Sequence, residues 1–334
     1  MRLATNNSTT SHAPAKSVDT ACGDLEQGVC IICRGPLDQH VARVFDTRFG
    51  IGGEYEVRRC RGCQLEQMSP VPTPRELKTL YESHYNFGGE KNTLYTNLRE
   101  WFFASFLYRL WIWLDGDVSF HGCTGTGRLL DIGCNEGRGL KIYAQNGFHV
   151  EGCELNETAA AVARDRGFSV YTSSLGDFTL SAPYDVAVLS NVVEHAPDPR
   201  QMLLDANRIL SPNGQVWISC PNSQSWLRKV FGRYWINWHV PFHISQFSPP
   251  TVSALLEQTG FTSIQIRQVT PAHWVAMSIL ARIFAKEGRS TRELHNPIFI
   301  VSLLFLVRFA AFPLLWFQNR RGRGDCLLIT ATKV

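Results

Sequence analysis

The sequence predicts an α/β fold in which a parallel sheet is covered by helices on both faces. Between residues 126 and 268, short apolar runs typical of buried strands alternate with segments of helical periodicity. One of these runs ends in a carboxylate and breaks into a glycine-rich loop, in the stretch LLDIGCNEGRG at 129–139. The length of 334 residues and the hydrophobic content of 44% favour one large domain with a sizeable core, accompanied by a small domain.

The individual elements follow from this alternation. We expect strands near 128–132, 149–153, 169–172, 184–190, 215–220 and 263–269. Helices are expected near 138–146, 157–166, 200–210 and 250–259, and further helices between 74 and 115. A long, mostly apolar stretch at 270–323 precedes a last strand at 326–332.

The glycine-rich loop predicts a nucleotide site. Asp131 ends a strand, and Gly133 and Gly137 let backbone N–H groups approach a ligand at the carboxyl ends of parallel strands. A nicotinamide site would have the spacing G-x-G-x-x-G, but Asn135 stands where the second glycine would be. An acid at a second strand end, Glu154, suits the two hydroxyls of a ribose.

The spacing D-x-G-x-x-x-G instead resembles motif I of class I S-adenosylmethionine (SAM) dependent methyltransferases, whose usual form D-x-G-x-G-x-G has a glycine in place of Asn135. Four later blocks resemble the same family in the same order: the EH-x-x-D-P block at 194–199, an L-x-P-G-G turn at 210–214, Pro221-Asn222, and Pro241-Phe242-His243. Asn213 replaces the first glycine of the L-x-P-G-G turn. The chain is most similar to ubiquinone-type O-methyltransferases and to methyltransferases of bacterial sugar and polysaccharide gene clusters.

The resemblance implies a Rossmann-like sheet with an antiparallel last strand, and the apolar stretch at 270–323 would then be an insertion between the final two strands. It also implies SAM as the cofactor. We expect Asp131 to bind the methionine amino end, Glu154 the ribose and Asn191 to lie beneath the methyl group. The full set expected to bind the cofactor is Asp131, Gly133, Cys134, Gly137, Glu154, Asp177, Phe178 and Asn191, of which Asp177 and Phe178 would lie at the adenine edge.

His243 and His195 are the candidate catalytic bases, because imidazole titrates near neutral pH and accepts a hydroxyl proton. A structural hydrogen bond is the alternative role for each. We favour His243, since the aromatic-rich loop at 235–247 is where substrate walls are expected, with His239 as one wall residue. Glu194 is expected to cap the helix that follows it, although it could instead orient His195.

Cys30, Cys33, Cys60 and Cys63 form two C-x-x-C pairs separated by 26 residues, a spacing typical of a zinc ribbon. We expect one structural Zn²⁺ ion held by these four cysteines. Two redox dithiols, or four unligated cysteines, are the alternatives. The segment that follows resembles the segment after such a ribbon in sugar-cluster methyltransferases.

These observations divide the chain into four parts. Residues 1–28 are polar and expected to be disordered, 29–72 form the zinc-ribbon-like module, 73–125 form a helical linker or lid, and 126–334 form the methyltransferase domain with its insertion at 270–323.

Charge and cysteine usage restrict partners and location. A net charge of +4 is too mild to indicate a nucleic-acid partner. Ten cysteines within a Rossmann-like pattern, and no apolar segment typical of a secretory signal, favour a reducing cytoplasm. The stretch at 298–317 is long enough for a membrane span, but the last strand must rejoin the sheet, which argues against a single crossing. Contact with the inner membrane surface, packing within the chain and a homodimer interface all remain open for it.

Together these features predict methyl transfer from SAM to a hydroxyl of a sugar, a polysaccharide precursor or an isoprenoid-linked small molecule. Transfer to carbon is less favoured. The expected partner is therefore a small-molecule or lipid-linked sugar acceptor. The alternative hypothesis is a catalytically silent scaffold in a membrane-associated biosynthetic complex, because of Asn135 and the apolar insertion.

Overall fold

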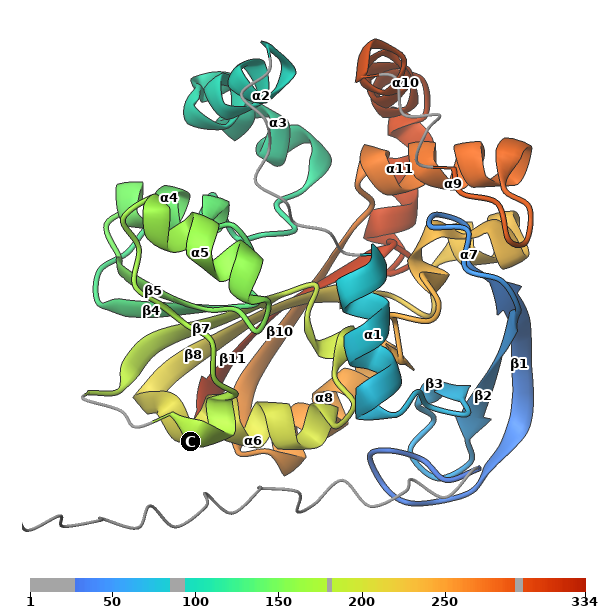
Figure 1. Cartoon of the computed structure of the whole chain (residues 1–334), viewed down its shortest axis with the longest axis horizontal. Helices are drawn as coiled ribbons and strands as arrows, with labels where there is room; N and C mark the ends of the chain where they lie inside the picture. The colour runs from blue at the N-terminus through green and yellow to red at the C-terminus, as the bar shows by residue number, and fades with distance from the viewer. Residues whose placement is uncertain (1–27, 85–93, 179–181, 292–296) are drawn as a thin grey trace, which may run out of the picture.

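The computed structural model describes residues 28–84, 94–178, 182–291 and 297–334 (Figure 1). The expectation of a disordered N-terminus concerns residues that, except for Gly28, lie outside these ranges.

A seven-stranded sheet forms the centre of the molecule (Figure 1). The strand order is β10-β11-β8-β7-β4-β5-β6, and β11 alone in this order runs antiparallel to both of its neighbours, β8 and β10. This arrangement confirms the predicted Rossmann-like fold with an antiparallel last strand. The bounds are β4 Arg128–Ile132, β5 His149–Cys153, β6 Val170–Tyr171, β7 Tyr184–Ser190, β8 Leu210–Pro221, β10 Phe261–Val269 and β11 Cys326–Lys333.

Helices cover both faces of this sheet, as predicted. In Figure 1, α4 (Arg138–Gln145) and α5 (Glu157–Asp165) lie above it, and α6 (Pro199–Ile209) and α8 (Pro249–Gln258) lie below it. Helix α6 begins at Pro199 because the Asp198 side chain accepts a hydrogen bond from the Gln201 amide at 2.9 Å.

Strand β8 differs from its prediction, because it begins at Leu210 rather than near 215. Asn213 adopts a left-handed φ of 63°, and the pairing of β7 with β8 shifts register between Tyr184 and Val186. The turn expected at this position is therefore a bulge inside a longer strand.

The cysteine module is a separate four-stranded sheet with the order β1-β2-β3-β9. Strands β1 (Leu37–Phe45), β2 (Glu54–Cys60) and β3 (Glu66–Ser69) come from the N-terminal part of the chain. Strand β9 (Ser245–Gln246) comes from the methyltransferase domain and pairs antiparallel with β3. The two domains therefore share a sheet.

Helix α1 (Pro74–His84) stands beside the cysteine module (Figure 1). Helices α2 (Leu94–Ala104) and α3 (Phe106–Asp115) lie at the same end of the molecule as α10 (Pro297–Ala310), and Figure 1 shows the ribbons of the two groups apart. Helices α9 (Ala272–Phe284), α10 and α11 (Phe312–Arg320) form the insertion between β10 and β11, as predicted. Within the described ranges no single helix has the length and hydropathy of a membrane span. Only the pair Ser302–Ala310 and Phe312–Arg320, bent by 63°, meets that test together.

Candidate active site

The glycine-rich loop after β4 turns sharply because three of its residues are left-handed. Gly133, Asn135 and Gly137 have φ values of 76°, 52° and 76°. Asparagine tolerates this region better than most residues, so Asn135 adopts the conformation that the family's glycine would allow. The loop is tied to the next strand, because the amides of Gly133 and Cys134 both donate to the Cys153 carbonyl, at 2.7 and 3.1 Å.

Two carboxylates face this loop from adjacent strand ends. Glu154 accepts hydrogen bonds from the amides of Asn135 and Asn156, at 3.0 and 2.8 Å. Asp131 is buried, and burial together with the nearby charge of Glu154 raises the pKa of Asp131 to about 7. Burial also raises the pKa of Glu154. A ligand with positive charge at this position would relieve the repulsion between the two acids.

The loops after β4 and β7 touch each other. Strands β4 and β7 are parallel neighbours, and a Cβ atom added to Gly133 would lie only 2.7 Å from Val192 Cγ2. Gly133 is therefore required by close approach as well as by its φ value. The contact brings the predicted cofactor loop next to the residues that follow β7, which include Glu194 and His195.

The other predicted cofactor residues lie at neighbouring strand ends. Asn191 follows β7 with a φ of 54°, and its amide donates to the Ser219 carbonyl at 2.9 Å. Asp177 is exposed and accepts a hydrogen bond from Ser174 Oγ at 2.6 Å. The buried Phe178 packs into the main core, so Asp177 is the more accessible of the two adenine-edge candidates.

The two candidate bases and the predicted wall residue His239 meet in one cluster. The ring centroid of His243 lies 4.6 Å from that of His195 and 4.8 Å from that of His239. His239 stacks on Phe242 at 5.3 Å, which agrees with its predicted role as a wall residue. The structure thus brings both candidate bases into contact.

Hydrogen bonds define the roles of the ring nitrogens in this cluster. His243 Nδ1 lies 2.8 Å from the Asn237 carbonyl, which only accepts, so Nδ1 carries the proton and Nε2 has the lone pair. His195 Nδ1 lies 3.0 Å from the Tyr81 hydroxyl, and His195 also makes a backbone hydrogen bond to Phe242. Burial lowers the pKa of His195 to about 4 and that of His243 well below its usual value, and the charge of Arg48 lowers both further. Both imidazoles are therefore neutral at physiological pH, and burial disfavours the imidazolium that would form when either ring accepts a proton.

The position of Glu194 differs from the expectation that it caps the next helix. Its side chain does not cap the next helix, because Asp198 does so. Instead, Glu194 is 1% exposed, and both of its carboxylate oxygens lack a hydrogen-bond partner among the described residues. Burial raises the pKa of Glu194 to about 8. Glu194 Oε1 lies 3.9 Å from His243 Nε2, beyond hydrogen-bond length, and the donor atoms of Glu194, His195 and His243 lie close enough together to hold a metal ion.

A buried polar network that sequence patterns did not indicate holds the loop bearing His243. Asp325, just before β11, accepts hydrogen bonds from Trp235 Nε1 at 3.1 Å, from Asn237 Nδ2 at 3.4 Å and from Ser225 Oγ. Because Asn237 in turn binds the His243 ring, Asp325 positions the candidate base. Asp325 is far from this loop in the sequence and belongs to no motif, so only the fold shows the connection.

Two aromatic residues outside the catalytic domain's motifs also reach the cluster. Tyr81 of α1 contacts Phe242 at 5.4 Å, in addition to its bond with His195. Phe49, in the loop between β1 and β2, lies 5.7 Å from His239 and 5.2 Å from Phe242. The cysteine module and α1 therefore contribute walls to the site. Phe49 belongs to no sequence motif, so its place in the site is seen only in the fold.

The four predicted zinc ligands come together. All four sulfur atoms lie within 4.8 Å of one another, with Cys30 Sγ 3.5 Å from Cys63 Sγ and Cys33 Sγ 3.4 Å from Cys60 Sγ. Sulfur atoms about 2.3 Å from one tetrahedral Zn²⁺ would be separated by similar distances. The Cys63 thiol, donating to Cys30, lowers the pKa of Cys30 to about 5, which favours a thiolate.

The two C-x-x-C turns have the same backbone geometry. In the first, Arg34 has a φ of 59° and its amide donates to the Cys30 carbonyl. In the second, Gln64 has a φ of 62° and its amide donates to the Cys60 carbonyl. The repeated turn fits the paired knuckles of a zinc ribbon, and the cysteines suit zinc by both arrangement and donor type.

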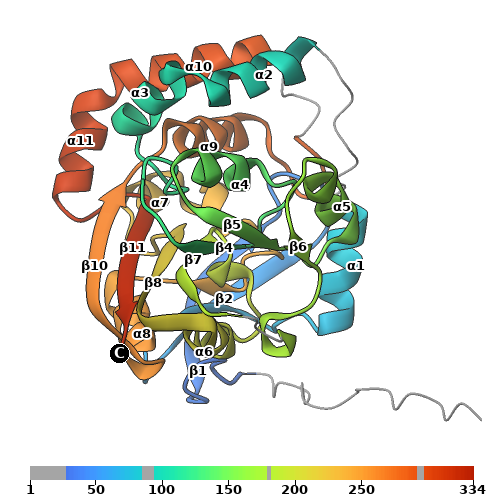
Figure 2. The ribbon, with the colours of Figure 1, turned by 90° about the vertical axis from the view of Figure 1, so that its left-hand side faces the viewer.

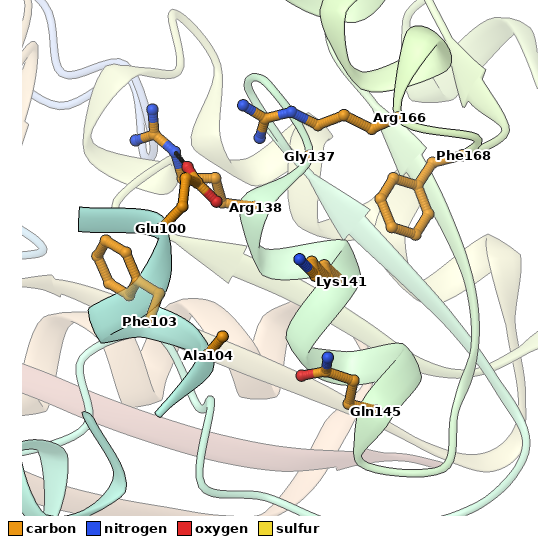
Figure 3. A pocket seen from close by; sticks show the side chains of 9 residues that line it. All are labelled: Glu100, Phe103, Ala104, Gly137, Arg138, Lys141, Gln145, Arg166 and Phe168. Atoms are coloured by element: carbon orange, nitrogen blue, oxygen red, sulfur yellow. Dashed lines mark hydrogen bonds and ion pairs between the residues drawn. The ribbon is translucent and has the colours of Figure 1, made fainter. Parts of the chain in front are cut away.

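A cavity of about 420 Å³ lies on the outer side of α4 rather than at the strand ends (Figure 3). Figure 3 shows Glu100 and Phe103 of α2 on one side of α4, and Arg166 and Phe168 on the other. Of the predicted cofactor residues it contains only Gly137, so it is distinct from the candidate cofactor site. Its lining residues are Glu100, Phe103, Ala104, Gly137, Arg138, Lys141, Gln145, Arg166 and Phe168.

Known proteins resemble the central part of the chain. A family model described as a methyltransferase domain matches residues 115–266. The "Ubiquinone biosynthesis O-methyltransferase" of Pseudomonas paraeruginosa is 30% identical over 134 residues, which cover 37% of this chain and 56% of that protein. The chain thus spans little more than half the length of this relative.

Two further matches extend over more of the chain. The protein of the same name from Aromatoleum aromaticum is 31% identical over 168 residues, which cover 46% of this chain and 70% of that protein. A solved SAM-dependent methyltransferase from Thermotoga maritima is 20% identical with a TM-score of 0.46, and the match covers 77% of this chain and 100% of that one. The matched methyltransferase domain agrees with the strand-end acids beside a glycine-rich loop. Together with the sequence identity to the Aromatoleum protein, this shows that the chain belongs to the SAM-dependent methyltransferase family.

Proposed function

We propose that the protein transfers a methyl group from SAM to a hydroxyl of a small molecule, with His243 as general base. The observation that carries this proposal is the meeting of two groups of residues at one edge of the sheet. The acids and the glycine-rich loop after β4 and β5 lie beside the segment after β7, through the close approach of Gly133 to Val192, and His195 of the histidine cluster belongs to that segment. A methyl donor and an acceptor must meet in this way for an in-line displacement.

The cofactor half of the site fits SAM. When bound, SAM supplies an electrophilic methyl group and carries positive charge on its sulfonium and amino groups. Asp131, with its pKa raised by burial and by Glu154, would be stabilised in its ionised form by such a cation. Glu154, half-buried at the end of β5, would bind the ribose hydroxyls.

The other half of the site would remove the acceptor's proton. The acceptor oxygen would bond to the methyl carbon as the bond from that carbon to the sulfur of SAM broke, with S-adenosylhomocysteine as the leaving group, and the hydroxyl proton would pass to the lone pair on His243 Nε2. The Asn237 carbonyl holds the opposite nitrogen and so stabilises the imidazolium that forms. Asp325 acts as a positioning residue, since it holds Asn237 and Trp235.

The walls of the site favour a ring-shaped acceptor. Phe49, Tyr81, His239 and Phe242 surround the two candidate bases with aromatic faces. Such faces bind sugar rings and aromatic rings alike. Relatives named for O-methylation in ubiquinone biosynthesis support a hydroxyl acceptor, and we include sugars and isoprenoid-linked small molecules in the proposed class.

The proposal includes one structural Zn²⁺ held by Cys30, Cys33, Cys60 and Cys63. Its support is the close cluster of four sulfurs on two matching turns. A zinc ion would fix the turns of a sheet whose own apolar core is small.

Labelling with radioactive methyl-SAM tests the proposed reaction. Purified full-length protein is incubated with the labelled cofactor and with fractions of an extract from its native cell. We expect label to enter a small-molecule or lipid fraction with the wild type and much less with His243→Ala. SAM binding without labelling of any fraction would contradict the proposal and favour the scaffold hypothesis.

A further inference from the structure

Four helices, the pair α2–α3 and the pair α10–α11, lie at the same end of the molecule, and we call this group of four helices the apolar layer (Figures 1 and 2). Helices α3 and α10 are held side by side by a contact between the rings of Trp111 and Phe305, whose centroids are 5.6 Å apart. A buried ion pair between Arg308 and Asp115, at 3.4 Å, joins the same two helices. Asp115 also accepts a hydrogen bond from the amide of Ala272 at the start of α9, so the layer is fixed to the rest of the fold.

The apolar layer carries a large share of the exposed apolar side chains. Among the described residues, 21 large apolar side chains are exposed, and 14 of these belong to the four helices. Phe106 and Trp113 are 75% and 79% exposed. Large apolar side chains gathered in this way on four helices at one end of the molecule mark a binding surface, since single exposed apolar residues are normally scattered. The fourteen are Leu98, Trp101, Phe106, Leu107, Leu110, Trp113, Phe299, Phe305, Leu306, Phe309, Phe312, Leu314, Trp316 and Phe317.

The charges around the apolar layer are almost all positive. Arg109, Arg320 and Arg321 are exposed, and the last two lie 4.6 Å from the ring centroids of Trp316 and Phe317. Helices α10 and α11 contain no acidic residue. Of the two carboxylates on α2 and α3, Glu100 pairs with Arg138 and Asp115 is buried against Arg308. Aromatic and apolar groups with arginines at their border match a lipid surface with anionic headgroups.

The topology keeps the chain on one side of such a surface. The segment leaves the sheet after β10 and returns to it as β11, which pairs with β10 and β8. The bend of 63° between the α10 and α11 segments also prevents them from forming one straight span. The layer would therefore lie in the headgroup region instead of crossing the bilayer.

Other occupants of the apolar layer fit its chemistry less well. Residues 1–27 contain only Met1, Leu3, Val18 and Leu25 as large apolar residues and no aromatic residue, so their composition does not match the face. A second copy of the chain would bring the arginines of both faces together without carboxylates to pair with them. We propose that the apolar layer binds the surface of an anionic phospholipid bilayer. This proposal does not depend on methyl transfer.

Vesicle flotation of the full-length protein tests the proposal. Vesicles of phosphatidylcholine alone are compared with vesicles that also contain phosphatidylglycerol. We expect the wild type to float with the anionic vesicles, less strongly as salt shortens the Debye length from about 10 Å at 0.1 M to about 3 Å at 1 M. Phe106→Glu with Trp113→Glu should lower the partition coefficient at least about tenfold, since burial of one aromatic side chain alone accounts for such a factor.

Matched variants separate the contribution of the apolar side chains to lipid binding from that of the arginines. Val230→Glu, at an exposed apolar position of α7 (Trp226–Phe231) outside the layer, should float like the wild type. Arg320→Gln with Arg321→Gln should reduce binding to anionic vesicles and reduce its salt dependence. Circular dichroism melting checks that each variant is folded.

Three results would overturn the proposal. One is a wild type that floats with neither kind of vesicle, and another is equal flotation of the Phe106/Trp113 and Val230 variants. The third is a wild type that light scattering shows to be a dimer in the absence of lipid and that Phe106→Glu with Trp113→Glu converts to a monomer, because a second copy would then cover the layer.

Discussion

Asparagine replaces glycine at two positions where the family motifs have glycine, and both asparagines adopt left-handed backbone. Asn135 in the cofactor loop has a φ of 52°, and Asn213 in the turn at the start of β8 has a φ of 63°. The departure from the motif at Asn135 therefore leaves the course of the loop unchanged. Asparagine fits these two positions because few other side chains tolerate left-handed backbone.

Single substitutions also identify which histidine is the base. We expect His243→Ala to lower kcat by about 10²–10⁴-fold, the usual contribution of general base catalysis. The Kd for SAM should change little, because neither candidate base contacts the cofactor in this account. Kinetics on the acceptor found by labelling, together with calorimetry for SAM, measure both quantities.

Two variants complete that comparison. His195→Ala tests the second candidate, and His149→Ala, at an exposed position of β5, serves as a control that should retain wild-type turnover. Near-wild-type turnover in both His243→Ala and His195→Ala would refute a histidine base, and positioning alone would then account for the rate.

The raised pKa of Asp131 leads to a prediction of how SAM affinity depends on pH. Its folded-state pKa is raised to about 7, and the positive charge of SAM favours the ionised carboxylate, so binding below that pKa releases a proton. We therefore expect affinity to rise with pH up to about 7 and then to level off. Calorimetry near pH 6 in two buffers of different ionisation enthalpy should detect the released proton, and Asp131→Asn should abolish the release. Affinity that falls as pH rises toward 7 would contradict the role given to Asp131.

At the scale of elements, the cysteine module is joined to the loop that carries His243. Strand β9, just after His243, pairs with β3 of the module. Arg228 of α7 forms a buried ion pair with Glu66 of β3 at 2.7 Å and lies over the ring of Trp238 at 4.3 Å. Arg228 is therefore held inside the fold by Glu66 and does not lie on a solvated helix face. Metal in the module should therefore affect the catalytic loop.

Metal removal tests this connection. We expect one zinc per chain, lost in a Cys60→Ser/Cys63→Ser variant that also has a lower melting temperature and a lower turnover. Metal analysis and calorimetric melting measure the first two effects. Cys123→Ser, at a half-buried cysteine outside the cluster, should keep both the metal and the stability. A metal-free wild type with the same melting temperature as the metal-loaded protein would argue against a structural ion.

At the scale of the whole molecule, local patterns predicted most of the fold. Short apolar runs between helical segments predicted the strands that pair in the central sheet, because a buried parallel strand needs a continuous apolar segment. The resemblance placed the insertion between the last two strands correctly. The shared β3–β9 pairing and the Asp325 network could not be predicted, since both join segments far apart in the sequence through hydrogen bonds that leave no periodic pattern.

The candidate site was predicted only in part, because some of its contacts also join segments far apart in the sequence. The motifs indicated the acids, the cofactor loop and both histidines, whereas Phe49 reaches the site only because the small sheet packs against it. The contact between Glu194 and His243 likewise depends on two loops meeting, and a helix cap was the simpler local expectation.

The central claim is that the loop after β4 and the acid after β5 bind SAM. Calorimetric titration of the full-length protein with SAM tests this most directly, with NAD as the competing ligand. We expect one SAM site per chain, weakened roughly tenfold or more by Glu154→Ala through the loss of hydrogen bonds to a charged group. Glu157→Ala, at an exposed acid three residues further on, should bind SAM like the wild type. Tight binding of NAD without binding of SAM, or equal SAM affinity in the Glu154 and Glu157 variants, would contradict this claim.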